Sequence, residues 1–560
     1  MDYSKLCAVY ERLEGTTKGL EKTSIVAEFL KSIKNFPEAI YLLQGKVFPD
    51  YDTRELGLSE QLVIKAIAKT GGVLEKEVTS LFKKLGDLGL VAEEIISKKK
   101  QTSLFSKKLK IEDVLRSLRK IAGFEGGGSI ESKINSVVEL LHNSSPKEAR
   151  YIVRTVLGDL KVGVGSGILR DGIVEFCFNP KSISEKKKLV EVVQEAYDKT
   201  NDFAEVFIRC LENSLDKIKL SPGRPVKVML FPKAKDISDA FRIVGKPAAF
   251  EYKYDGFRMV INKDNKDNVK IFTRRLENVT KQFPDVVSSV LSNVSAKSFI
   301  IDSEAVGYDK KSGKYTPFQA ISQRIKRKYG IEKMAAELPI ELVVFDIIFL
   351  NGKNLIDTPF EKRRKLLEKI VKQKKKKIVL AKQIITDREE VVEKFYAEAI
   401  SNGQEGLMGK NLKAPYKPGS RVGYAVKLKP KDRDFDLVIT GAEWGTGKRA
   451  GWLTSFDVSC RDGEKLLAVG KVSTGLKELS EEGLSFEEMT KILKKLIISE
   501  SGRHVKIKPR IVVSVQFQNI QKSPTYESGY ALRFPRINAL RPDRGIYDIA
   551  TLKDIKSSSK

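Results

Sequence analysis

Lys253 stands in the string EYKYDGFR, where a β-rich run enters a turn at Gly256. A lysine amine acts as a nucleophile only when it is neutral, so neighbouring cations or burial must lower its pKa. A Lys-x-Asp-Gly string alone arises by chance in a chain of this length about one time in ten. Its interpretation therefore depends on the strings that accompany it.

Further charged strings follow Lys253 in order, each at the end of a predicted strand or in a turn. They are FTRRLENVT (272–280), IDSEAVGYD (301–309), VVFDIIFLNG (343–352), EGLMGK (405–410), RVGYAVKLK (421–429) and ALRFPRINALRPDRG (531–545). Their cations can supply the positive field that a nucleophilic lysine needs, and their carboxylates suit Mg²⁺. Taken singly, each charge is better explained as a solvated surface residue. As a set, they predict a site for phosphate chemistry.

Other kinds of catalytic site are poorly supplied with residues. The chain has only two histidines, His142 and His504, which leaves little room for a Ser-His-Asp triad or an imidazole-rich metal site. The four cysteines lie far apart without a CxxC pair, so the sequence predicts neither a disulfide framework nor a thiolate zinc site. Catalysis must therefore depend on Lys, Arg, Asp and Glu.

The composition is strongly basic, with 102 Lys and Arg against 73 Asp and Glu, a net charge of +29. Such an excess favours a polyanionic partner, because neutralising phosphates releases counterions; a lysine-rich proteome is the other explanation. With 560 residues, 41% of them apolar, several domains with cores of their own are expected, and collagen or global disorder is excluded. No apolar run is long enough for a membrane span and the first residues lack a signal-peptide pattern, so we expect a soluble protein that is not secreted.

Three regions with different patterns of apolar and polar residues must position these strings. Up to about residue 220, apolar residues recur at spacings of three and four, which predicts a helical domain. Pro222, Pro225 and Pro232 then predict an extended linker. From about 224 to 430, β-rich runs alternate with helical ones, and after Pro430 short strands predict a small β-barrel.

The ordered strings resemble those of the covalent nucleotidyltransferases and, among them, the ATP-dependent DNA ligases of the archaeal and eukaryotic replicative type. In the helical region, YIVRTVLGDLKVGVGSGILRDGI (151–173) is similar to the signature of that family's DNA-binding domain, and GRPVKVML is similar to its entry segment. The resemblance implies a multidomain chain with an all-α DNA-binding domain (1–222), an α+β adenylation domain (223–430), an OB-fold β-barrel (431–552) and a mobile tail (553–560).

By the same resemblance, Lys253 is the nucleophile, Glu251 recognises the edge of the adenine and Phe345 stacks on its face. From its strand alone, Phe345 would be an ordinary core aromatic. The resemblance implies ATP and Mg²⁺, or another divalent cation, as cofactors. The other implied nucleotide-binding residues are Arg258, Arg274, Glu304, Arg421, Lys427 and Lys429. The implied metal ligands are Glu304 and Glu405, and the implied lid over the pyrophosphate is Arg541, Asp543 and Arg544.

Three positions depart from the family's pattern. Ala425 stands where an aromatic residue is common, two positions before Lys427. Arg544 replaces the usual lysine, so that a planar guanidinium takes the place of a compact ammonium. Ser514 stands where a glutamate is usual. These departures concern the orientation of the nucleotide rather than the reaction.

The implied activity is the sealing of nicks in duplex DNA through a lysyl-AMP and a 5′-adenylated strand. Roles in DNA replication, repair and recombination, a monomeric state, and a cytoplasmic, nucleoid-associated location, nuclear if the source is eukaryotic, are implied with it. An RNA ligase or an RNA-capping guanylyltransferase would share the chemistry, but neither explains residues 1–220 as well. A catalytically inactive nucleic-acid scaffold is the alternative from another class. An NAD-dependent ligase would need a four-cysteine zinc module that these cysteines cannot form.

A polar, basic stretch, SKKKQTSLFSKKLK, precedes the helix predicted from Ile111 and contains the adjacent apolar residues Leu104 and Phe105. One explanation is that these two side chains fold back onto the domain. Gln101, Leu104 and Phe105 also resemble the peptide by which replication proteins bind sliding clamps of the proliferating cell nuclear antigen type. The resemblance implies a weak clamp-binding site, because Ser106 replaces the usual second aromatic residue.

Overall fold

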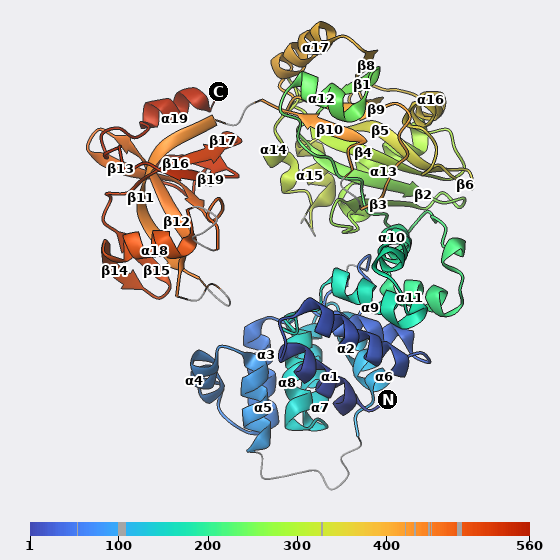
Figure 1. Cartoon of the computed structure of the whole chain (residues 1–560), viewed down its shortest axis with the longest axis vertical. Helices are drawn as coiled ribbons and strands as arrows, with labels where there is room; N and C mark the ends of the chain where they lie inside the picture. The colour runs from blue at the N-terminus through green and yellow to red at the C-terminus, as the bar shows by residue number, and fades with distance from the viewer. Residues whose placement is uncertain are drawn as a thin grey trace. The chain divides into compact units, whose positions relative to one another are not determined.

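The computed structural model describes residues 1–52, 54–98, 108–325, 327, 329–419, 422–430, 433–445, 449, 451–478 and 484–559. The chain forms two compact units, Met1–Lys429 and Pro430–Lys560, and Figure 1 labels their helices and strands. Among the residues so described, no helix is both long enough and apolar enough to cross a membrane.

The first part of the Met1–Lys429 unit is built from helices, as predicted. Their bounds are α1 (Tyr3–Glu14), α2 (Gly19–Ser32), the 3₁₀ helix η1 (Pro37–Gln44), α3 (Glu60–Gly71), α4 (Glu75–Leu85), α5 (Leu88–Ser97), α6 (Ile111–Ala122), α7 (Ser129–His142), α8 (Pro146–Val156), α9 (Ser166–Phe178), α10 (Ile183–Thr200), α11 (Phe203–Leu211) and η2 (Leu215–Lys217). Ser145 and Glu148 form a reciprocal cap at the start of α8, where Pro146 fits the first turn. The apolar stripes of these helices meet in one core.

A buried ionic cluster ties α5 to α8 and to the loop that follows α8. Asp87, which also caps α5, accepts bonds from Arg154 Nη2 (2.9 Å) and Lys161 Nζ (2.9 Å). Burial disfavours the carboxylate, but the side chains of Arg154 and Lys161 outweigh it and hold the pKa of Asp87 at about 2. This part of the fold therefore depends on an ionised Asp87.

The rest of the Met1–Lys429 unit contains two antiparallel sheets and the helices that cover them. One sheet has the order β10-β9-β1-β8, and the other has the order β3-β2-β4-β5-β6 with β7 parallel to β5. The strands are β1 (Ala248–Tyr252), β2 (Phe257–Lys263), β3 (Val269–Thr273), β4 (Phe299–Gly307), β5 (Ile340–Leu350), β6 (Lys353–Asn354), β7 (Ile378–Leu380), β8 (Gln383–Thr386), β9 (Leu407–Asn411) and β10 (Ala425–Leu428). The helices are α12 (Ile237–Val244), η3 (Thr280–Gln282), α13 (Pro284–Asn293), α14 (Phe318–Ser322), α15 (Ile331–Glu337), α16 (Phe360–Ile370) and α17 (Glu389–Ser401).

Strand alternation gives each sheet one apolar face and one face that also carries charged side chains, called the charged face below. In the first sheet, Glu251, Met408 and Lys427 lie opposite one another across β1, β9 and β10, so their side chains share a face. Phe250 and Val426 alternate with them and enter the core with residues of α12 and α17. The charged face of this sheet is therefore the one turned away from that core.

The second sheet repeats the arrangement. Arg258 on β2 lies opposite Glu304 on β4, whereas their neighbours Phe257 and Ala305 enter a core with residues of α13 and α16. Figure 1 shows the two sheets side by side in this part of the chain. Lys410 of the first sheet lies 4.9 Å from the ring centre of Phe345 in the second. The two charged faces therefore meet.

The Pro430–Lys560 unit is rich in β-structure, as predicted. Its elements are β11 (Arg433–Trp444), β12 (Leu453–Asp462), β13 (Lys465–Val472), α18 (Phe486–Lys494), β14 (Ile497–Ser501), β15 (His504–Ile507), β16 (Val512–Phe517), β17 (Asn519–Lys522), β18 (Tyr530–Arg533), β19 (Arg536–Leu540) and α19 (Leu552–Ser558). The long strand β11 pairs with β12, β15 and β16, which wraps the sheet around the main core of the unit. That this unit is an OB-fold stays a prediction.

A mobile tail was expected at the end of the chain, over 553–560. Residues 552–558 form α19, because Thr551 and Asp554 cap it reciprocally. Leu552 and Ile555 are buried in the core of the same unit, on one face of the helix. Two apolar anchors and a cap are enough to dock a short helix, and the mobility expected of this tail stays a prediction.

Candidate active site

Backbone hydrogen bonds hold Lys253 on both sides, between β1 and β2. Its N–H donates to the carbonyl of Gly406 (2.8 Å), and its carbonyl accepts from the N–H of Glu405 (2.8 Å). A Cβ on Gly256 would lie 2.2 Å from the carbonyl oxygen of Ala305 on β4. The glycine in the Lys-x-Asp-Gly string is therefore required for the close approach of the lysine turn to the second sheet.

The side chain of Lys253 meets a carboxylate that a second lysine shares. Nζ of Lys253 lies 2.6 Å from Oε2 of Glu405, and Nζ of Lys429 lies 2.5 Å from the same atom. Burial opposes ionisation of Glu405, but the charges of Lys253 and Lys429 outweigh it and hold its pKa well below the usual range. Two cations and one anion therefore meet at the turn between β1 and β2 that contains Lys253, called the lysine turn here.

Glu304 lies beside this cluster, opposite Arg258 in the second sheet. Burial raises the pKa of Glu304 to about 7; the charges of Lys253 and Arg258 lower it, and those of Glu405 and Asp302 raise it. A carboxylate with a raised pKa next to a second carboxylate is the electrostatic environment that a divalent cation relieves.

Arg258 is held in a buried network. Its Nε and Nη2 donate to the two carboxylate oxygens of Asp302 (2.8 and 2.5 Å), and Nη1 donates to the carbonyl of Met229 (2.8 Å). The hydroxyl of Tyr416 donates to Asp302 (2.8 Å) and accepts from the N–H of Met229 (3.2 Å). The segment that enters the domain is thus bonded directly to the arginine of the lysine turn.

Glu251 is almost fully buried, with 2% of its surface exposed. Its Oε1 accepts from Nε2 of Gln383 (2.8 Å), with Nη1 of Arg364 at 3.6 Å. Its Oε2 lies 2.5 Å from Nζ of Lys410. Three side chains from different elements therefore surround the carboxylate to which the family resemblance gives the adenine edge.

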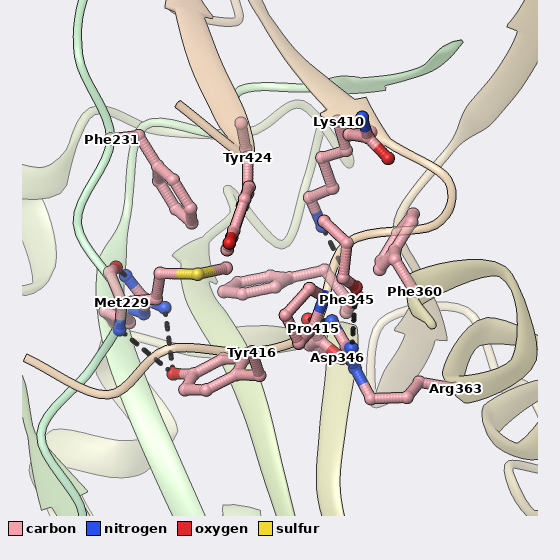
Figure 2. Close-up of a pocket in the computed structure, with 14 residues that line it drawn as sticks. Met229, Phe231, Phe345, Asp346, Phe360, Arg363, Lys410, Pro415, Tyr416 and Tyr424 are labelled. Carbon is pink, nitrogen blue, oxygen red and sulfur yellow. Dashed lines mark hydrogen bonds and ion pairs between the residues drawn. The ribbon is translucent and has the colours of Figure 1, made fainter. Parts of the chain in front are cut away.

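Phe345 lines the pocket drawn in Figure 2, together with Met229, Phe231, Arg258, Tyr416 and Tyr424. Behind it, Asp346 is bound by Arg363 through two bonds, Nε to Oδ1 at 2.7 Å and Nη2 to Oδ2 at 3.0 Å. Both partners are buried. The ion pair therefore binds strand β5, which carries Phe345, to helix α16.

The other residues predicted to contact the nucleotide are Lys427, Arg274 and Arg421. Lys427 lies on β10, whose backbone bonds to the entry segment at Pro232 and Ala234. Arg274 is exposed just after β3. Arg421 lies outside the described residues, as do the predicted clamp-binding residues Gln101, Leu104 and Phe105.

The predicted lid residues lie in the Pro430–Lys560 unit. Arg541 bonds to Asp543 through Nε and Nη2, both at 3.2 Å. Nη1 of Arg541 lies 3.4 Å from Asp436 on β11, and Nε of Arg544 lies 3.7 Å from the same carboxylate. The guanidinium groups of the motif are therefore held by local carboxylates.

Two of the departures from the family's pattern have local structural partners. Ala425 is buried and forms part of the pocket wall in Figure 2. Ser514 donates to a carboxylate oxygen of Asp434 (3.2 Å) across β16 and β11. A hydroxyl at 514 therefore satisfies a carboxylate that a glutamate there would repel.

Comparisons with known proteins identify the family. Three family models match: DNA ligase N terminus over residues 2–174, ATP dependent DNA ligase domain over 228–429 and ATP dependent DNA ligase C terminal region over 449–544. The DNA ligase of Nanoarchaeum equitans is 48% identical, across 99% of this chain and 98% of that protein. The chain belongs to the ATP-dependent DNA ligases. The DNA ligase of Thermococcus fumicolans, 44% identical across 99% of this chain and 98% of its own length, agrees.

The ligase also shares its fold with a solved structure named Pmar-Lig_PreS3, at a TM-score of 0.59. That match covers 96% of this chain and 99% of the other at 16% identity. The membership confirms the sequence prediction of the family, of the three-domain architecture and of DNA ligase activity. It also confirms the use of ATP by this family.

The sequence motifs predicted no role for several site residues of the ligase. Lys410 ends the string EGLMGK and Asp302 begins the acidic part of IDSEAVGYD, so a charged residue in a buried strand was the available signal. Gln383, Arg364 and Tyr416 lie outside any of the strings, and only the pairing of distant strands and helices brings them to the site.

Proposed function

We propose that the ligase seals nicked duplex DNA through a lysyl-AMP on Lys253. The neutral amine attacks the α-phosphorus of ATP and displaces pyrophosphate; the AMP then passes to the 5′-phosphate of the nick, and the 3′-hydroxyl displaces it. The observation that supports this assignment is the convergence of Lys253 and Lys429 on Glu405, beside Glu304. Such a site acts chiefly by positioning and by stabilising charge on the phosphoryl group.

The remaining nucleotide contacts follow from the two charged sheet faces. Glu251 accepts a hydrogen bond from the base and Phe345 stacks on it. The phosphates and ribose lie among cations that neutralise charge as it develops. These cations are Arg258, Arg274, Arg421, Lys427 and Lys429.

A divalent cation fits the two carboxylates of the site. Glu304 and Glu405 offer hard oxygen donors, and Mg²⁺ commonly binds one or two carboxylates together with substrate phosphates. Among the described residues, no group of three or more His, Cys, Asp and Glu side chains could hold a metal ion. A bound Mg²⁺ would supply charge stabilisation at the phosphates. Glu304 and Glu405 would hold it, and Lys429, which pairs with Glu405 in the structure, would contact phosphate.

The domain boundaries 1–222, 223–430 and 431–552 and the OB-fold of the third domain are part of the same proposal. Arg541, Asp543 and Arg544 close over the pyrophosphate during the first step. This role requires the salt pairs with Asp436 to exchange for phosphate contacts, which guanidinium groups make well.

Labelling with α-labelled ATP and Mg²⁺, followed by denaturation, tests the proposal. Wild type and Lys235→Ala, which changes an exposed lysine, should retain label, and Lys253→Ala should retain none. Lys253→Ala should still join a nick that is already 5′-adenylated, because the last step does not use the amine. Label on Lys253→Ala would show that another residue is the nucleophile.

The cellular setting is proposed from the resemblance. The ligase acts as a cytoplasmic monomer in DNA replication, repair and recombination, and Gln101, Leu104 and Phe105 bind a sliding clamp. The double variant Leu104→Ala with Phe105→Ala should seal short nicked duplexes normally and lose co-elution with the clamp from the same source. Unchanged co-elution would remove the clamp role.

A further inference from the structure

Lys410 connects the two residues to which the proposed function assigns the base. It is 6% exposed and lies on β9 between Ala249 and Ala425, whose small side chains leave room for its stem. Its Nζ is 2.5 Å from Oε2 of Glu251 and 3.4 Å from the carbonyl oxygen of Phe345, and Figure 2 marks the second contact. A buried ammonium thus bonds to the carboxylate and to the backbone of the aromatic residue.

The ammonium also packs against two aromatic rings. Nζ of Lys410 lies 4.9 Å from the ring centre of Phe345 and 4.5 Å from that of Phe360 on α16. At such distances a cation is attracted to the ring faces. Lys410 is therefore held in one position, and it fixes the distance between the Glu251 carboxylate and the Phe345 ring.

The bonds to Glu251 leave part of its carboxylate available. An ionised carboxylate has about four lone-pair sites, and the described donors within hydrogen-bonding distance are Gln383 on Oε1 and Lys410 on Oε2. The remaining sites can accept from an amino group and not from a carbonyl. Adenine presents an exocyclic amino group where guanine presents a carbonyl oxygen.

We propose that Lys410 is a positioning residue that sets the selectivity of the ligase for adenine over guanine. It holds the Glu251 carboxylate as an acceptor at the edge of the base and ties it to the ring that stacks on the face of the base. The inference rests on the proposed function, in which Glu251 and Phe345 bind the base. A buried carboxylate that loses the closer of its two cations, with Arg364 left at 3.6 Å, moves toward another donor, and an acceptor so displaced no longer distinguishes the two bases.

The test compares self-nucleotidylation with α-labelled ATP and α-labelled GTP. Lys410→Met should raise KM for ATP about thirtyfold or more, leave kcat within about threefold and change KM for GTP little, so that selectivity falls. Lys410→Arg should recover part of the selectivity, because it keeps the charge. Lys413→Met, which alters an exposed lysine beyond the end of the same strand, should behave as wild type.

A matched loss with ATP and GTP, or a loss confined to kcat, would overturn the inference. If Lys410→Met does not fold, Lys410→Gln decides in its place, since it keeps a donor without the charge and should also lose selectivity. Glu251→Gln combined with Lys410→Met should cost no more than the larger single effect, because both act on one contact; additive losses would contradict this. Absence of label on wild type would refute the proposed function instead.

Discussion

The buried pair of Asp346 and Arg363 gives a sharp test of how the ligase supports Phe345. Asp346→Ala removes the carboxylate that binds the guanidinium twice, at 2.7 and 3.0 Å. Nη1 of Arg363 would keep its bonds to the carbonyls of Thr358 and Ala414. These carbonyls satisfy donors but carry no net charge, so the variant leaves a buried cation without its counterion.

The magnitude follows from the burial of both partners. Arg363 is 1% exposed and Asp346 is 3% exposed. Removing one member of such a pair costs about 3–5 kcal/mol, whereas replacing both by apolar residues of similar volume is often nearly neutral. Asp346→Ala should therefore be much more damaging than the double variant Asp346→Leu with Arg363→Met. Glu368→Ala, which removes an exposed partner on the same helix, should cost at most about 0.5 kcal/mol.

Hydrogen exchange read by mass spectrometry can separate the two units. Peptides from Ile340–Leu350 and Phe360–Ile370 should lose about hundredfold to several thousandfold protection in Asp346→Ala. A peptide from Leu453–Asp462, in the other unit, should be unchanged. The two tryptophans, Trp444 and Trp452, also lie in that other unit. The urea-unfolding transition followed by their fluorescence should therefore keep its wild-type midpoint.

Two results would refute the reasoning. Wild-type protection of β5 and α16 in Asp346→Ala would mean that the pair contributes little, and a double variant as unstable as Asp346→Ala would mean that packing rather than charge is responsible. A rise in KM for ATP is expected with Asp346→Ala, because Phe345 precedes Asp346 on the strand.

Three further predictions follow from the site and its supports. Asp87→Asn should destabilise the helical region by about 2 kcal/mol at pH 7, because the pKa of Asp87 is about 2 in the fold and 3.8 as its ordinary value. This stabilisation is present above pH 3.8 and is lost as the pH falls toward 2. The melting temperatures of variant and wild type should therefore converge in acid, and a difference that stays constant with pH would contradict the assignment. Gly406→Ala should abolish lysyl-AMP formation, because φ is +132° and its Cβ would lie 2.1 Å from the Leu428 carbonyl oxygen. Gly403→Ala, also at a positive φ (+72°) but with open space around its Cβ, should retain the label. Lys429→Ala should slow adenylation at least about a hundredfold by removing one of the two cations on Glu405, and a wild-type single-turnover rate would exclude that role.

The sequence alone was sufficient for the family, and it supplied the residue types of the proposed site. Lys253 in its Lys-x-Asp-Gly string and the lysines at 427 and 429 stood out because cations near a nucleophilic amine suit phosphate chemistry. The helical region could also be predicted from the sequence, because the recurrence of apolar residues at spacings of three and four is a local property of the chain. A helix at the end of the chain was not expected, although Thr551 and Asp554 form a visible capping pattern.

Tertiary structure decided which charges meet. Lys429 joins Lys253 on Glu405, Lys410 reaches Glu251, and Tyr416 binds Asp302 only because β1, β9 and β10 pair in one register and the second sheet packs against them. Strand pairing between distant segments leaves no local signal in the sequence, and a shift of one residue would put Glu251 and Lys410 on opposite faces of their sheet. The types of the proposed site residues can therefore be recognised in local stretches of sequence, whereas the fold decides which of these residues contact one another.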